Sequence, residues 1–171
     1  MPFAFGHLVF AWLIGKILVK TRIFEIKRPE WFLLLFGALF PDIDFIAGWV
    51  FGTNIHRTFT HSLFMAFAGF LLIYFVCIVI DRRLNGERYG LFFSFGILSH
   101  IIADMVLGYP GIPLLWPLTS RFWFFGYVNN YIWTTLTYEQ INYKLNSAIF
   151  DMGLGVLWIG YLFFKEKLKE F

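Results

Sequence analysis

The sequence PDID at residues 41–44, followed by HRTFTHS at residues 56–62, is the stretch around which this chain is organised. It places two aspartates and two histidines close together in a chain that is otherwise strongly apolar and rich in phenylalanine. Carboxylates and imidazoles are common ligands of divalent metal ions. A proline inside an apolar run also tends to end a helix. The stretch therefore predicts both a break between helical segments and a group of candidate metal ligands.

The two remaining histidines, His7 and His100, extend this group. His100 and Asp104 are four residues apart, and on a helix this spacing puts both side chains on the same face. Taken singly, each candidate has an ordinary explanation as a hydrogen-bonded pair, an interfacial histidine, a headgroup contact, a turn residue or a helix cap. The full set favours a metal site, because ionisable groups in a membrane are costly and usually functional. The candidate ligands are His7, Asp42, Asp44, His56, His61, His100 and Asp104.

The composition is that of a membrane protein. The chain has 171 residues, which is one domain by length. Its mean hydropathy is +0.69. The share of apolar residues, 59%, is above that of a typical soluble domain, and the share of charged residues, 15%, is below it. We therefore expect an all-α, polytopic membrane bundle. The net charge of +3, without a basic stripe, argues against nucleic acid as a partner. The single cysteine, Cys77, allows neither a disulfide framework nor a thiolate metal site.

About five membrane segments follow from the apolar runs, at residues 4–19, 30–40, 62–80, 89–107 and 146–164. The second is shorter than the roughly 20 residues of a spanning helix. Pro41 ends it, so we expect residues 45–51 to form a short re-entrant piece. Thr60 is expected to cap the third segment, and residues 121–138 have the aromatic composition of an interfacial element. Residues 1–120 carry all the motifs of the single domain 1–171, and 121–171 add the interfacial and last transmembrane segments. The first segment lacks the features of a cleaved signal peptide, so we expect it to be retained.

The basic residues predict an orientation in the membrane. Eleven of the fourteen fall into three groups, at residues 16–28, 82–88 and 165–169. Short loops rich in lysine and arginine stay in the cytoplasm. Five crossings of the inner (plasma) membrane, with the N-terminus outside and the C-terminus in the cytoplasm, put all three groups on the cytoplasmic side. The same topology brings all seven candidate ligands to the opposite face, although no ligand was used to derive it.

The ligand types indicate the chemistry. Nitrogen and oxygen ligands without sulfur suit zinc, and also manganese or iron. Seven candidates exceed the four ligands of one site, so we expect one or two ions. If there are two, a bridging carboxylate would bind both. Paired metals activate a water and clamp the oxygens of a phosphoester. Arg57 and Arg121 are candidate phosphate contacts, because a guanidinium binds oxyanions with two hydrogen bonds. Each can instead be an interfacial cation.

These motifs resemble the LexA-binding, inner-membrane-associated, YdjM-like family of metal-dependent hydrolases. The matching parts are the early His7, PDID at 41–44, HRxxTHS at 56–62 and SHxxxD at 99–104, with LWP at 115–117 ending a proline-rich stretch. The resemblance covers residues 1–120. It implies hydrolase activity but no particular substrate.

A more distant resemblance is to the all-helical superfamily of zinc-dependent phospholipase C and single-strand nucleases. There an aspartate precedes a histidine by fourteen residues and a later His-x-x-x-Asp completes the site, and the same spacing occurs here. The matching residues are Asp42, His56, His100 and Asp104, with His7 near the place of the N-terminal ligand. This resemblance implies that Asp104 bridges two ions. The superfamily's downstream His-x-x-x-Glu has no counterpart in this sequence.

We therefore predict a phospholipase-like, metal-dependent hydrolase that cleaves a phosphoester of a membrane lipid or lipid-linked substrate at the extracytoplasmic face. Asp42, Asp104 and Arg57 are the predicted catalytic residues. Activated water would attack phosphorus while Arg57 assists charge stabilisation. Two other functions fit the sequence: a metal-binding membrane protein without catalysis, such as a transport or sensor component, and a membrane scaffold that recruits a soluble partner.

Overall fold

The computed structural model describes residues 4–52, 56–107, 111–126, 138–165 and 167–171. These residues form helices and loops, with no β-strand beyond an isolated bridge between Ile112 and Trp123. The elements are α1 (Ala4–Lys20), α2 (Arg28–Leu39), the 3-10 helix η1 (Phe40–Asp42), α3 (Ile43–Phe51), η2 (Phe59–His61), α4 (Leu63–Ile80), α5 (Gly86–Leu107), α6 (Tyr138–Phe164) and η3 (Lys167–Glu170). The predicted all-α class is confirmed.

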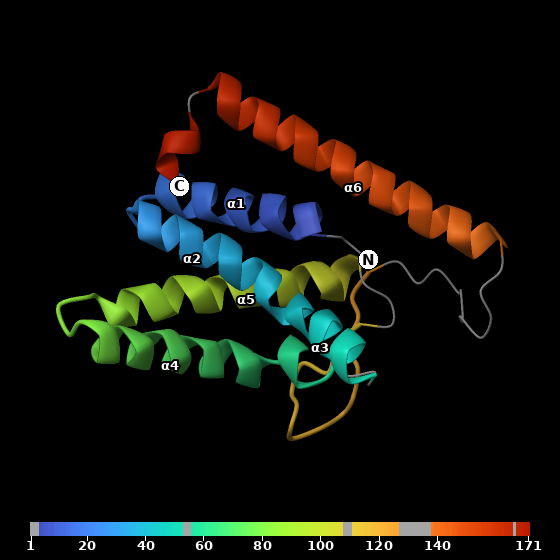
Figure 1. The fold of residues 1–171 in the computed structure, drawn as a ribbon, viewed down its shortest axis with the longest axis horizontal. Coiled ribbons are helices and arrows are strands. Elements are labelled where there is room, and N and C mark those ends of the chain that lie inside the picture. The colour runs from blue at the N-terminus through green and yellow to red at the C-terminus, as the bar shows by residue number, and fades with distance from the viewer. Residues whose placement is uncertain (1–3, 53–55, 108–110, 127–137, 166) are drawn as a thin grey trace.

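Within these described ranges, four helical stretches are long and apolar enough to cross a membrane, at residues 28–51, 63–80, 86–106 and 145–164. The second and fourth, which belong to α4 and α6, bury only 17% of their apolar windows inside the protein. Helices that leave this much apolar surface uncovered fit a lipid surrounding. α1 has 17 residues and is about 25 Å long. It lies beside α2 and α6 as the fifth rod of the bundle (Figure 1).

The expected break at Pro41 is a single tight turn. α2, η1 and α3 follow one another in nearly one direction (Figure 1), where we expected a short segment and a separate re-entrant piece. Pro41 lies at the start of η1, where a backbone N–H would have no partner within the helix, so its absence in proline costs no hydrogen bond. The fixed φ of proline also suits this turn. The proline is therefore tolerated, and by length and composition residues 28–51 form one span.

The centre of the bundle is the contact between α2 and α5. Gly37 and Gly96 let the two backbones touch. A Cβ at Gly37 would lie 2.2 Å from the carbonyl oxygen of Phe93, and a Cβ at Gly96 would lie 2.2 Å from that of Leu34. Small residues permit this close approach between membrane helices. The contact fixes how far α5 is shifted along α2, and with it the relative height of the ionisable residues near their ends.

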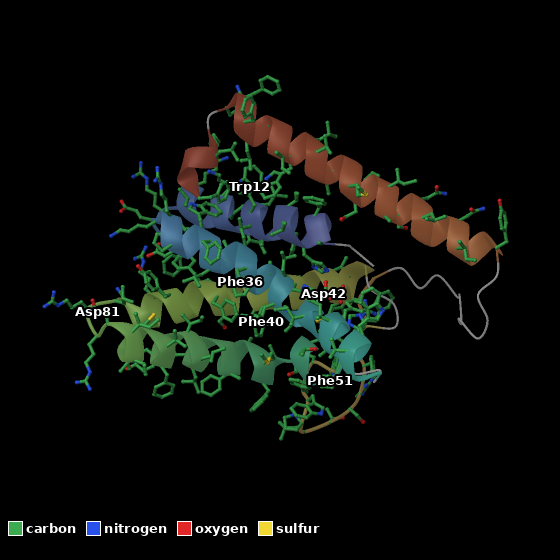
Figure 2. The ribbon with its side chains drawn as sticks, viewed as in Figure 1. Trp12, Phe36, Phe40, Asp42, Phe51 and Asp81 are labelled. Carbon is green, nitrogen blue, oxygen red and sulfur yellow. The ribbon has the colours of Figure 1, made fainter. Side chains whose placement is uncertain are left out.

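The helix ends fall into two groups at opposite ends of the bundle. In Figure 1 the start of α1, α3, the start of α4 and the end of α5 lie at one end, and the α1–α2 and α4–α5 connections lie at the other. Asp42 and Asp81 mark these two ends in Figure 2. At the end with the basic loops, Arg88 donates to the buried carboxylate of Glu30 and to the carbonyl oxygen of Glu25. The grouping of ends that the basic loops predicted is therefore present in the fold.

Two local predictions need correction. Ser62, not Thr60, caps α4, because its hydroxyl oxygen accepts from the backbone N–H of Met65 at 3.2 Å. α5 begins at Gly86 and not at residue 89. The predicted last membrane segment, 146–164, agrees with the apolar span at 145–164, and its helix α6 already begins at Tyr138. Of the expected interfacial element 121–138, residues 127–137 lie outside the described part of the chain.

Candidate metal centre

Two histidines face each other at the centre of the site. His61 and His100 are both fully buried, and their Nε2 atoms lie 3.1 Å apart. His100 comes from α5, and its Nδ1 lies 2.8 Å from the carbonyl oxygen of Ala38 in α2. Because a carbonyl oxygen only accepts, this Nδ1 must carry the proton, and the Nε2 of a neutral His100 then has the free lone pair. The close contact of α2 and α5 thus aims this lone pair at His61.

Two aspartates complete a four-donor group. Asp42 Oδ1 lies 3.7 Å from His61 Nε2 and 3.6 Å from His100 Nε2. Asp104 Oδ2 lies 3.6 Å and 3.8 Å from the same two atoms. Metal–ligand bonds of 2.0–2.2 Å in a tetrahedron put neighbouring donors about 3.3–3.6 Å apart. The distances from each aspartate to the two imidazoles, and between the imidazoles, are 3.1–3.8 Å and lie near this range, so the group is of a size to hold a divalent ion.

His7, in the first turns of α1, lies against this group. Its ring stacks on that of His100 with 3.7 Å between centroids and 12° between planes. Its Nε2 is 3.7 Å from Asp104 Oδ1. Among the described residues, neither ring nitrogen of His7 nor this Asp104 oxygen has a hydrogen-bond partner, although all are buried. One oxygen of Asp104 thus faces His7 and the other faces His61 and His100, as in a carboxylate that bridges two ions.

His56 lies on the other side of Asp42. Donor atoms of Asp42, His56 and His61 fall within 4.8 Å of one another, as do those of His7, Asp42 and His100. His56 Nδ1 donates to Asp44 Oδ1 at 2.9 Å, and its buried Nε2 has no partner within the described part of the chain. Asp42 therefore belongs to both of these candidate groups of metal ligands.

Asp44 is buried and its oxygens are already engaged. Oδ1 accepts from His56, and Oδ2 accepts from the Thr60 hydroxyl at 2.6 Å and from the backbone N–H of Arg57 at 3.2 Å. A carboxylate with three donors has little capacity left for a metal, but it can orient a histidine that binds one. The surroundings of Asp44 favour this orienting role over direct ligation.

Arg57 brings one positive charge to the site. Its side chain is 7% exposed, and its guanidinium Nη2 donates to Asp104 Oδ2 at 3.2 Å. Its φ of +58° is uncommon for a residue with a side chain and belongs to the turn between α3 and η2. Arg121, the other candidate phosphate contact, instead lies over the ring of Trp123 at 5.3 Å.

The charges of the site fit a divalent cation. The site contains three carboxylates, from Asp42, Asp44 and Asp104. Within the described contacts, Arg57 is the one guanidinium beside them, so two negative charges stay uncompensated when the histidines are neutral. Uncompensated buried charges are strongly destabilising. A single divalent ion would supply the missing charge, and buried donor atoms without a hydrogen-bond partner among the described residues, such as Asp42 Oδ1 and Asp104 Oδ1, lie beside imidazoles of the site.

The structure brings all seven candidate ligands into one contiguous cluster, and their roles as ligands stay a prediction. Three contributors were not recognised from the sequence. Thr60 joins Asp44 to His61, at 2.9 Å from His61 Nδ1. The Ala38 carbonyl orients His100. Asp151 in α6 accepts from the backbone N–H groups of Phe5 and Gly6, at 3.0 and 2.7 Å, just before His7. An aspartate within an apolar helix was the one available signal for the last of these.

Comparison with known proteins gives a consistent family assignment. A model of the YdjM inner membrane protein family matches residues 1–168. The inner membrane protein YbcI of Escherichia coli is 38% identical over 98 residues, covering 51% of this chain and 53% of the relative. The inner membrane protein YdjM of Escherichia coli is 32% identical over 136 residues, covering 68% of this chain and 66% of the relative, and its namesake from Shigella flexneri gives the same values.

The chain spans about half to two thirds of the length of these curated relatives. No solved structure matches the chain at a significant level.

Proposed function

This chain belongs to the YdjM inner membrane protein family, and from that premise we propose that it is a membrane-embedded, metal-dependent hydrolase. Its substrate would be a phosphoester of a lipid or lipid-linked molecule. The observation that carries the proposal is the group formed by Asp42, His61, His100 and Asp104, in which both aspartates bring an oxygen within 3.6–3.8 Å of the two facing imidazole Nε2 atoms. The uncompensated negative charge of this buried group supports the same conclusion.

The chain offers the parts that phosphoester hydrolysis needs. A divalent ion bound to this group, zinc in the first place and otherwise manganese or iron, would lower the pKa of a water molecule and polarise a phosphoryl oxygen. Asp42 holds that ion from the open side of the site, because its side chain is 22% exposed while those of His61 and His100 are fully buried. His56 is 18% exposed and lies beside it. Substrate would therefore approach along Asp42 and His56.

Arg57 and Asp104 would act on the phosphate from within. The Arg57 guanidinium lies against Asp104, where it can donate to the oxygens on which charge develops. Asp104 has one oxygen toward each half of the site and would balance the repulsion between two ions. We assign catalytic roles to Asp42, Asp104 and Arg57 on these grounds.

A lipid substrate fits the surroundings of the open side. α3 starts at the site and exposes three apolar residues: Ile46 is 63% exposed, Trp49 93% and Val50 70%. An apolar helix face that leads away from the site is a suitable surface for acyl chains. By the distribution of basic loops this end of the bundle faces away from the cytoplasm, with the N-terminus outside and the C-terminus inside.

The decisive experiment measures metal and turnover together. The wild-type protein, purified in detergent and supplied with Zn²⁺ or Mn²⁺, is incubated with a native lipid extract, and mass spectrometry follows the loss of phosphoester lipids. We expect hydrolysis that depends on the metal. Asp104→Asn should lower turnover more than metal content, because the amide keeps the shape and one oxygen donor but loses the charge.

A second function has one observation in its favour. Four protein donors close a tetrahedral coordination sphere, and closed spheres are typical of structural sites. Metal bound at full stoichiometry by a wild-type protein that cleaves neither native lipids nor a model phosphodiester would establish a metal-binding membrane protein without catalysis.

A further inference from the structure

A chain of three buried groups leads from Asp44 to the centre of the site. Thr60 Oγ1 lies 2.6 Å from Asp44 Oδ2 and 2.9 Å from His61 Nδ1. All three residues are at most 7% exposed. On the far side of the His61 ring, Nε2 is 3.1 Å from His100 Nε2. Thr60 therefore hydrogen-bonds both Asp44 and His61, whose own Oδ2 and Nδ1 atoms lie 3.5 Å apart.

The direction of the protons in this chain follows from its chemistry. A hydroxyl has one proton to donate, and an ionised carboxylate can only accept. Asp44 also accepts from His56 and from the backbone N–H of Arg57, and these two donors stabilise its ionised form. The Thr60 proton therefore goes to Asp44. The Thr60 oxygen must then accept from His61, so His61 carries its proton on Nδ1 and has its lone pair on Nε2.

The consequence is a matched pair of imidazoles. His100 is held in the same tautomer by the carbonyl of Ala38. Two lone pairs therefore point toward one another and toward the oxygens of Asp42 and Asp104. If the Thr60 hydroxyl donated to His61 Nδ1 instead, Asp44 would lose a donor. The proton of His61 would then lie on Nε2, where the metal is proposed to bind. The Thr60 hydroxyl, which makes the shorter contact to His61 Nδ1 (2.9 Å, against 3.5 Å for Asp44 Oδ2), thus supports this tautomer of His61.

We propose that Thr60 is a positioning residue of the metal site, which transmits the orienting effect of Asp44 to His61 and fixes the His61 tautomer. The proposal rests on the proposed metal site and assigns its hydrogen-bonded support. In this scheme Asp44 orients two histidines, His56 directly and His61 through Thr60. Such outer partners typically change metal affinity by about 10–100-fold when they are removed.

The test compares Thr60→Val, which removes the hydroxyl at nearly constant shape, with Thr60→Ser, which keeps it. Thr21→Val is the matched control, because the Thr21 hydroxyl is exposed and donates only to the backbone of its own helix. Zn²⁺ affinity is measured on the full-length purified proteins by competition with a chelator. We expect about 10–100-fold weaker binding for Thr60→Val, and near wild-type binding for Thr60→Ser and Thr21→Val.

A second measurement reads the tautomer without metal. The chain has four histidines, so ¹⁵N spectra of histidine-labelled, metal-free protein are simple, and His61→Gln assigns the His61 signals. We expect a protonated Nδ1 and an unprotonated Nε2 in the wild type, and a mixture of tautomers in Thr60→Val. Helix content from circular dichroism checks that each variant is folded.

The two measurements separate this proposal from the metal site on which it rests. Wild-type protein that binds no Zn²⁺ contradicts the metal site, and the tautomer comparison still decides on Thr60. Thr60→Val with unchanged affinity and an unchanged His61 tautomer overturns the positioning role. A Thr60→Ser variant as weak as Thr60→Val also overturns it, because the effect would then belong to the methyl group.

Discussion

At the scale of single residues, the two aspartates of PDID differ in what surrounds their oxygens. Asp42 Oδ1 is buried, has no hydrogen-bond partner in the described part of the chain and faces two imidazoles. Asp44 accepts three hydrogen bonds. We predict that Asp42→Ala strips metal from the purified protein, because it removes one of the proposed metal ligands. Asp44→Asn should keep metal at saturation with an affinity about 10–100-fold weaker.

Elemental analysis and chelator competition on both variants provide the measurement. Asp81→Asn, at the opposite end of the bundle, is a control that should behave as the wild type (Figure 2). Equal loss of metal in the Asp42 and Asp44 variants would contradict the distinction and make Asp44 a ligand.

Arg57 allows a second prediction at this scale. An ammonium group cannot reproduce the two parallel hydrogen bonds that a guanidinium makes to phosphate. We predict that Arg57→Lys lowers phosphoester turnover at least about 10-fold while metal per protein stays at the wild-type level. Arg121→Lys is the matched control, since Arg121 lies over Trp123. Undiminished hydrolysis by Arg57→Lys would reduce Arg57 to a structural partner of Asp104.

The residues of the site were largely predictable, but the division of labour among them was not. Residue type and spacing single out the seven acidic and imidazole side chains that the fold brings together. Thr60 and Ser62 are both good N-cap residues, and only the course of η2 decides that Ser62 caps α4 while Thr60 turns toward Asp44. A hydroxyl group has many partners available, so its role is visible only in three dimensions.

At the scale of helices, the close crossing of α2 and α5 positions the site. A Cβ at Gly96 would also meet Ala38 N at 2.7 Å, next to the carbonyl that orients His100. We predict that Gly96→Ala forces the helices apart, costs about 1–3 kcal/mol of stability and weakens metal binding. Gly160→Ala in α6 is the control, because nothing lies within 4 Å of its Cβ. Denaturation curves and metal affinity of both variants test this.

An unaltered Gly96→Ala protein would mean that the helices can separate without moving His100, and that α2 does not control the site. A destabilised Gly160→Ala protein would point to a general intolerance of substitutions in these helices.

Helix boundaries could be predicted where composition changes sharply. α1 ends within one residue of the predicted position, at the start of a basic link. The course of residues 28–51 could not be predicted, because a proline can end a helix or start a new turn, depending on where the preceding carbonyl groups point. The apolar span in α6 starts within one residue of the predicted position, but the helix itself extends to Tyr138 through polar first turns that composition does not mark. The Gly37–Gly96 contact has no signature in a sequence that contains fifteen glycines.

At the scale of the whole molecule, α6 is linked to the site through Asp151. This residue is 6% exposed and accepts from two N–H groups in the first turn of α1, immediately before His7. A carboxylate at this position accepts from the free N–H groups at the start of the helix, and its negative charge interacts favourably with the positive end of the helix dipole. The last helix, which carries none of the predicted motifs, therefore helps to hold the candidate ligand His7 in place.

The two-ended arrangement of the molecule leads to the last prediction, which concerns orientation. Candidate ligands lie at one end of the bundle and the basic loops at the other (Figure 1), and basic loops stay in the cytoplasm. Asn85 and Ser120 are exposed residues of the α4–α5 connection and of the loop after α5. In a Cys77→Ala background, we predict that a membrane-impermeant thiol reagent added to intact cells labels Ser120→Cys but not Asn85→Cys. Permeabilised cells should label both, which controls for reactivity. Labelling of Asn85→Cys alone would invert the protein in the membrane, and labelling of both in intact cells would exclude a site and basic loops on opposite faces.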